Sequence, residues 1–371
     1  MTEILLNHDT VNAAAFPLLL IGDSNYYQDE IKQARAFALN ALRSDFDKDI
    51  CLSCSFGKDS LLCAVILAEA LDLLNDKRKI NLTFFYSGYE KPTFKRWFDY
   101  CCNHIDKSRF NIKYITPSPF YRLGVKLLGC GRVPVNPVYG RWCTGIKTEL
   151  IKILNDKICK NNIEIVGTRA AESSKRNIDW KSNGYLQTGR GKRAYRIIGG
   201  VSTAAVWWYL ERNLEKIGLD FELLRAYYNT DTRDGCWFCY AQKYDKPDTL
   251  EAAITLRLRE YNGGVANINK ELRIAPDILR TSLYYCKKWY YELLELQDKY
   301  NKYLLNETDK KYIFELWNIR EKIDDFINQK KFLEAYLNGR YTMLYPELFD
   351  KTFYKKGEKY HYIRYDLLEI E

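Results

Sequence analysis

Histidine is scarce in this sequence, with three residues among 371. Transition metals in proteins are held mainly by histidine nitrogen, cysteine sulfur and carboxylate oxygen. Because the chain has 11 cysteines, we expect any metal site to be built mostly from sulfur. Irregularly spaced cysteines in odd number, without an export signal, indicate a reducing compartment in which thiols are buried, catalytic or metal-bound.

Glycine and proline are also few, at 20 and 9 residues, which excludes collagen-like and linker-rich architectures. Long apolar runs are missing too. The longest, Val11–Gly22, is interrupted by Asn12 and Pro17 and is shorter than the roughly 18 residues that a membrane helix needs. The start, Met1–Ile4, lacks the basic residues of a secretory signal. We therefore expect a soluble, cytoplasmic protein with no membrane partner.

The overall composition is that of a globular protein, with 47% hydrophobic residues, 28% charged residues and 30 tyrosines. The formal net charge is +9. This charge suits a phosphate-rich partner, and it suits a basic solvated surface equally well.

Residues 46–245 alternate short apolar strands with helical segments. The expected strands are Ile50–Ser55, Ile80–Tyr86 and Ile163–Val166. This alternation predicts an α/β domain with a doubly wound, mostly parallel sheet. Ligands of such sheets bind at the carboxyl ends of the strands, so the segments that follow the strands are the candidate functional sites.

The flanking regions have a helical pattern. Residues 1–45 read as a lead-in with an amphipathic helix around Glu30–Leu39. Residues 246–371 read as a helical subdomain with long helices at Leu283–Tyr303 and Lys310–Leu337. It ends in a basic, aromatic hairpin at Thr352–Arg364.

The first strand is followed by Ser55-Phe56-Gly57-Lys58-Asp59-Ser60. Gly57 permits a tight turn, and the helix that follows offers its free backbone N–H groups to an anion. Phosphate is the expected ligand, although the GxxxxGK[ST] spacing of kinase-type NTPases is absent. An ordinary capped turn is the alternative reading.

Two further segments follow strands in the same way. The second strand leads into Ser87-Gly88 and Pro92, and the third leads into Gly167, Arg169, Glu172 and Arg176. Two arginines can hold phosphate in a bidentate manner, and Glu172 can orient one of them.

Together these segments resemble the SGGxDS, DTGxxxP and GxRxxESxxR elements of the PP-loop ATP pyrophosphatases, in the branch of phosphoadenylylsulfate (PAPS) reductase. Tyr86 stands where that branch usually has aspartate. The resemblance implies an adenine-nucleotide alpha-hydrolase-like fold and an enzyme that uses ATP and Mg²⁺, splitting ATP between its α and β phosphates. It implies catalytic roles for Lys58, Asp59 and Arg169, and nucleotide binding by Ser55, Phe56, Gly57, Lys58, Asp59, Ser60, Ser87, Gly88, Arg169, Glu172 and Arg176. The helical segment Val201–Leu210 resembles a further element of the branch and is expected to serve as scaffold.

Cysteines form the last candidate site. Cys236 and Cys239 have the C-x-x-C spacing that grips one metal or cluster, and Cys143 can add a third thiolate. Thiolates alone suit zinc and iron-sulfur equally. The R-W-C-T and G-C-W-x-C elements resemble the Dnd-type ATPases of DNA phosphorothioation, which implies a [4Fe-4S] cluster. Its fourth ligand would be Cys130, unless one iron is left open. The remaining cysteines are expected to be buried and inert.

The resemblance implies an ATP-dependent sulfurtransferase that adenylates an acceptor, a DNA backbone phosphate, for sulfur insertion. Its partners would be DNA, a cysteine desulfurase and other subunits of a modification complex. A tRNA thiolase shares this chemistry. A PAPS or adenylylsulfate reductase shares the loop, but its C-terminal E-C-G-x-H element is not found here. The alternative that is not an enzyme is a zinc-knuckle subunit that binds nucleic acid. The stretch Lys181–Arg196, with five basic residues and no acidic one, is expected to be a mobile loop that closes over ATP or nucleic acid.

Overall fold

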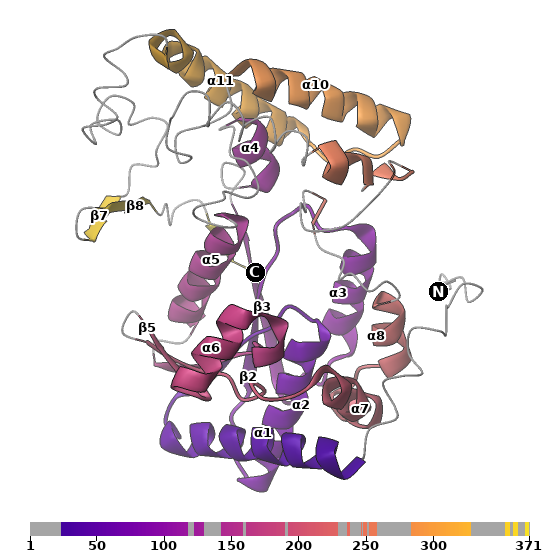
Figure 1. The fold of residues 1–371 in the computed structure, drawn as a ribbon, viewed down its shortest axis with the longest axis vertical. Coiled ribbons are helices and arrows are strands. Elements are labelled where there is room, and N and C mark those ends of the chain that lie inside the picture. Colours follow the sequence, from indigo (N-terminus) through magenta and orange to yellow (C-terminus); the bar gives the residue numbers. More distant parts are fainter. Residues whose placement is uncertain are drawn as a thin grey trace. The chain divides into compact units, whose positions relative to one another are not determined.

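The computed structural model describes residues 24–117, 122–129, 142–158, 161–189, 192–228, 236–237, 246, 248–250, 252–257, 283–327, 353–356, 359–362 and 368–370 (Figure 1). The chain forms two compact units. Unit 1 comprises Met1–Phe85, Pro92–Tyr114 and Ile151–Asp234, and unit 2 comprises Tyr86–Lys91, Ile115–Leu150 and Gly235–Glu371.

Unit 1 has an α/β fold, which confirms the predicted class. Its elements are α1 (Ser24–Ser44), β1 (Asp49–Ser53), α2 (Lys58–Leu73), β2 (Ile80–Phe85), α3 (Pro92–His104), β4 (Asn162–Val166), α6 (Ser174–Asn183), β5 (Leu186–Gly189), β6 (Lys192–Tyr195), α7 (Thr203–Asn213) and α8 (Phe221–Tyr227). A 3-10 turn, η5 (Ala170–Glu172), precedes α6, and another, η6 (Leu214–Ile217), follows α7. Strand β3 (Phe110–Pro117) and helix α5 (Trp142–Ile158) contribute residues to both units.

The sheet is mostly parallel, with the strand order β5-β6-β4-β1-β2-β3. Strand β1 is central and pairs in parallel with β2 and β4. In this register Ser53, the last residue of β1, lies opposite Thr83 and Val166. The segments that follow β1 and β4 therefore leave the same edge of the sheet, as the sequence predicted for a ligand site.

Helix α2 lies at the centre of unit 1 and is apolar on nearly every side. Ten of its eleven buried residues are apolar, and the run extends from Ser60 to Leu71. A helix that is hydrophobic all round must be covered on all sides, and α2 packs on both α1 and α7 (Figure 1). Helix α1 buries one stripe, including Ile31, Ala38 and Leu42. The burial of α2 anchors its first turn at the edge of the sheet.

The prediction of a mobile loop at Lys181–Arg196 is wrong over much of this segment. Strands β5 and β6 form an antiparallel pair there, and β6 also pairs in parallel with β4. Arg196 is 4% exposed and forms an ion pair with Asp179. Basic residues and glycines such as those of this segment are also common in flexible loops, so the composition misled the prediction. Strand β3 was not anticipated.

In the residues that the structure describes, unit 2 is mainly helical. Its elements are α4 (Leu123–Leu128), α10 (Leu283–Lys299), α11 (Glu307–Ile327), and the strands β7 (Phe353–Lys356), β8 (Lys359–Tyr362) and β9 (Leu368–Ile370). Strands β7 and β8 pair in antiparallel fashion, which confirms the predicted hairpin, and β9 pairs with residues 115–117 of β3. Helices α4, α10 and α11 share one core, whose buried members include Val125, Trp289 and Leu316. None of the helices in the described ranges is long and apolar enough to span a membrane.

Candidate active site

The candidate phosphate loop joins β1 to α2, and its backbone is shaped by Phe56. The sequence suggests that Gly57 makes the turn, but Gly57 has an ordinary φ of −89°, whereas Phe56 takes the left-handed φ of 52°. A bulky residue pays a steric cost for this conformation. The fully buried Phe56 ring packs on Phe98 at 5.2 Å between ring centroids. The indole N–H of Trp97 donates to the Phe56 carbonyl at 2.7 Å. These contacts hold the loop in its turn.

Gly167, directly after β4, contacts the start of α2 through backbone alone. A β-carbon at this position would lie 3.1 Å from the Ser60 nitrogen and 3.2 Å from the Asp59 carbonyl group. These neighbours are backbone atoms of a helix, and they cannot move aside independently. Glycine at position 167 therefore allows the turn after β4 to lie against the first turn of α2.

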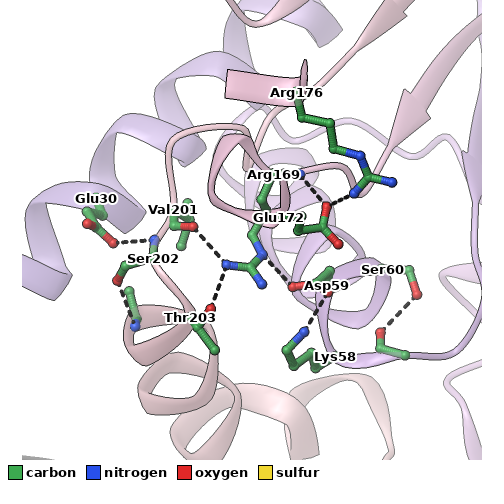
Figure 2. Close-up of polar contacts among 12 residues, drawn as sticks. Glu30, Lys58, Asp59, Ser60, Arg169, Glu172, Arg176, Val201, Ser202 and Thr203 are labelled. Atoms are coloured by element: carbon green, nitrogen blue, oxygen red, sulfur yellow. Dashed lines mark hydrogen bonds and ion pairs between the residues drawn. The ribbon is translucent and has the colours of Figure 1, made fainter. Parts of the chain in front are cut away.

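A chain of polar contacts connects the same two segments (Figure 2). The Asp59 carboxylate forms ion pairs with the Lys58 ammonium at 2.7 Å and with the Arg169 Nε at 2.6 Å. Arg169 is 4% exposed, and its Nη1 donates to the Val201 carbonyl at 3.2 Å and to the Thr203 hydroxyl at 3.0 Å. Thr203 is the first residue of α7, so the helix that was expected to be scaffold also orients a site residue.

Glu172 orients Arg176 and the backbone next to Arg169. Its carboxylate accepts from the Arg169 backbone N–H at 2.9 Å and forms an ion pair with the Arg176 guanidinium. The Arg176 side chain is 45% exposed. The expected orienting role of Glu172 is therefore seen at Arg176, whereas the Arg169 guanidinium is held by Asp59.

The remaining loop residues lie at the start of α2. Ser60 is buried, and its hydroxyl donates to the Gly57 carbonyl at 2.9 Å. Ser55 is half-buried at the end of the strand. The structure thus brings Ser55, Gly57, Lys58, Asp59, Ser60 and Arg169 together around one helix N-terminus.

The predicted residues Ser87 and Gly88 belong to unit 2. Gly88 has a φ of 80°, and the Ser87 hydroxyl accepts from the Tyr89 N–H at 3.2 Å. The Ser87 N–H donates to the Glu90 carboxylate. Burial raises the pKa of Glu90, although hydrogen bonds from this turn act in the opposite direction. The segment is a compact, self-bonded turn.

Two residues that the sequence analysis missed hold this turn. The Arg122 guanidinium lies 3.5 Å from the position that a β-carbon on Gly88 would take. The Nη1 of Arg122 donates to Asp309 at 3.0 Å, and the Tyr89 hydroxyl donates to the same carboxylate at 2.9 Å. Asp309 is fully buried. Arg122 and Asp309 are 187 positions apart, so no local motif indicates this contact.

Two of the four candidate metal ligands can be placed. Cys143, near the start of α5, and Cys236 are both half-buried, and both pack against the core of unit 2. Cys236 forms an antiparallel bridge with Glu90, and the Trp237 N–H donates to the Tyr89 carbonyl at 2.8 Å. Cys130 and Cys239 lie outside the described residues. Within the described part of the chain, no three metal-binding side chains converge.

The other described cysteines have the buried environment that was predicted, apart from the half-buried Cys102. Cys51, Cys54, Cys63, Cys101 and Cys286 are at most 2% exposed. Burial raises the pKa of Cys63 and Cys101 well above the ordinary value, and it raises the pKa of Cys102 to about 11. These three thiols therefore stay protonated at neutral pH and are poor nucleophiles and metal ligands.

No protein-family model matches the chain, and no curated protein matches it. Among solved structures, it is similar to a U34-tRNA thiolase, NcsA from Methanococcus maripaludis with its [4Fe-4S] cluster. The identity is 15%, the match covers 72% of this chain and 80% of that one, and the TM-score is 0.37. It is also similar to a PAPS reductase from Candida auris in complex with phosphate. There the identity is 15%, with 58% and 96% of the two chains covered and a TM-score of 0.34.

Proposed function

We propose that this protein is an ATP-dependent sulfurtransferase that splits ATP between its α and β phosphates to activate an acceptor. One observation carries the proposal. The first turn of α2, the turn after β4 and the first residue of α7 meet around the Asp59–Arg169 ion pair, at the edge of the sheet where β1 and β4 end.

The start of α2 has the properties of a phosphate site. Its first amides have no partner within the helix, and the helix dipole adds partial positive charge. Lys58 and Arg169 supply two cations, while Asp59 holds both side chains in place. Catalysis here would consist of positioning and of charge stabilisation on the phosphates. Mg²⁺ would arrive with ATP as part of the substrate.

The proposed activation step is a displacement at the α-phosphorus. An acceptor oxygen forms a bond to this phosphorus while the bond to the oxygen that bridges the α and β phosphates breaks. Pyrophosphate leaves, and the acceptor carries AMP. In the second step hydrosulfide forms a bond to the activated acceptor atom, and AMP leaves. A cysteine desulfurase, together with a thiol reductant, would supply sulfur at the oxidation level of sulfide.

Cys143, Cys236, Cys239 and Cys130 are the proposed ligands of a [4Fe-4S] cluster. Cys143 and Cys236 fit this role because they are only half-buried and pack against the same core. Zinc is the alternative metal for the same thiolates. If Cys130 is not a ligand, one iron would be left open and would hold the sulfur that is to be transferred.

The proposed acceptor is a DNA backbone phosphate, which would become a phosphorothioate. The net charge of +9 favours a polyanionic acceptor. The strands β7 and β8 add three basic residues, Lys355, Lys356 and Lys359. A tRNA acceptor would be bound by the same charge, and the experiment below separates the two.

The test is a product assay under anaerobic conditions with ATP, Mg²⁺, a cysteine desulfurase, labelled cysteine and a thiol reductant. We expect AMP and pyrophosphate, with label entering DNA. Label in tRNA would overturn the DNA acceptor only, whereas ADP and phosphate, or no turnover, would overturn the ATP chemistry. Lys58→Ala should abolish the reaction. Lys216→Ala is the matched control, because Lys216 is 58% exposed on η6 and forms its ion pair with Glu69.

A further inference from the structure

Tyr228 places a neutral oxygen at the N-terminus of α2. The helix begins at Lys58, and its N-cap residue, Gly57, has no side chain that could cap it. The Lys58 N–H donates instead to the Tyr228 hydroxyl at 2.9 Å. The first hydrogen bond within the helix runs from Leu61 to Gly57, so the Lys58 amide is one of the amides that the helix leaves for an outside acceptor.

Other aromatic side chains hold the Tyr228 ring in this position. Tyr228 directly follows α8 and is half-buried. Its ring makes edge-on contacts with Trp207 and Tyr227, each at 5.2 Å between ring centroids. The Lys58 ammonium lies over the ring at 5.8 Å. Tyr228 therefore contacts both the backbone N–H and the side-chain cation of Lys58.

A phosphate oxygen would compete for the same groups. It is the stronger acceptor, since a charged oxygen gains more than a phenol from a backbone N–H and from the helix dipole. One N–H cannot hold two oxygens at full hydrogen-bond strength. A polyphosphate that accepts a hydrogen bond from the Lys58 amide would therefore displace the Tyr228 hydroxyl from it.

We propose that Tyr228 is a positioning residue of the phosphate site. Its hydroxyl holds the Lys58 amide while the site is empty, and it leaves that amide when a phosphate of ATP binds. This inference rests on the proposed function, and it assigns to Tyr228 a part in setting the affinity for the nucleotide.

The test compares Tyr228→Phe with wild type by calorimetric titration with ATP and, separately, with pyrophosphate. Phenylalanine keeps the ring and removes the competing oxygen. We expect the variant to bind both ligands about 3- to 10-fold more tightly, the equivalent of one ordinary hydrogen bond. Tyr291→Phe is the control, because Tyr291 is 56% exposed on α10, and we expect unchanged affinity.

Equal or weaker binding by Tyr228→Phe, with normal binding by wild type, would overturn the role of Tyr228 and leave the proposed function standing. Absence of binding by both proteins would overturn both. Hydrogen exchange on wild type answers the same question without a variant. Pyrophosphate should slow exchange at the Lys58 amide and speed it at the Tyr228 amide, which bonds to the last turn of α8. Slower exchange at both amides would overturn the displacement.

Discussion

The Asp59 carboxylate accepts a hydrogen bond from the Nε of Arg169 at 2.6 Å, across 110 positions of the chain. The contact joins the first turn of α2 to the turn that follows β4. Arg169 is 4% exposed, so the pair is shielded from solvent, and loss of one partner would leave the other as a poorly compensated charge.

Arg169→Lys is expected to lower kcat/KM for pyrophosphate release by about 100-fold, because lysine cannot bond Asp59, Val201 and Thr203 together. It should also destabilise the fold by about 1–3 kcal/mol. A pyrophosphate assay and denaturant titration measure the two effects. Arg212→Lys is the control, since Arg212 forms an exposed ion pair with Glu211. Wild-type kinetics in Arg169→Lys would show that the guanidinium fork is dispensable.

Gly167→Ala should destabilise the fold by about 1–3 kcal/mol, because the new methyl group meets helix backbone that cannot yield. The affinity for ATP should fall as the start of α2 shifts. Thermal unfolding and ATP titration measure these changes. Gly200→Ala is the matched control: its β-carbon would meet only side-chain atoms, those of Trp180 at 3.4 Å and the Gln33 amide oxygen at 3.9 Å. Equal effects of the two substitutions would contradict the tight contact at Gly167.

Trp97→Phe removes the N–H that bonds the Phe56 carbonyl and keeps an aromatic ring. A buried carbonyl without a donor costs about 1–3 kcal/mol, and Phe56 needs this support for its left-handed φ. We expect lower stability in urea and weaker ATP binding. Unchanged ATP affinity in a destabilised variant would show that the loop keeps its shape without Trp97.

Glu69→Gln should destabilise the protein at neutral pH but not in acid. Burial acts to raise the pKa of Glu69, but hydrogen bonds from Tyr209, Arg35 and Lys216 outweigh it and hold that pKa below its ordinary value. The ionised carboxylate therefore contributes stability above the unfolded pKa of about 4.3, and this contribution is lost as the pH falls through the folded pKa.

The expected loss at pH 7 is about 1 kcal/mol, since solvent screens a partly exposed network. Chemical denaturation of both proteins from neutral pH down to about pH 3 measures the difference. A difference that stays constant over this range would rule out the ionised form of Glu69 as its origin.

Cys236→Ala and Cys143→Ala should each remove bound metal from protein that is purified without oxygen. Iron, sulfide and zinc contents, with the visible spectrum, are the measurements. A brown wild type with colourless variants supports the iron-sulfur cluster. Cys102→Ser is the control, because Cys102 lies on α3 and its raised pKa keeps it a thiol. A colourless, zinc-bound wild type would replace the cluster with a zinc site.

Local patterns were enough to predict the α/β fold, the three strands that precede the candidate segments, and the hairpin of β7 and β8. Burial of Cys51 and Cys63 followed from their positions around the loop. These features depend on the period of apolar residues and on short-range turns, which the sequence displays directly. The edge strand β5 and its neighbour β6 were missed because these four-residue segments show no apolar alternation.

By itself, the sequence determined which segments follow β1 and β4, and it pointed to Lys58, Asp59 and Arg169 as residues of one site. Only the tertiary structure showed that Phe56, and not Gly57, has the left-handed φ. It also showed that Asp59 pairs with Arg169 and that the Tyr228 hydroxyl accepts a hydrogen bond from the Lys58 amide. Such contacts join residues that are distant in the chain. Their partners are selected by packing of the sheet and helices, and no spacing rule along one segment encodes that choice.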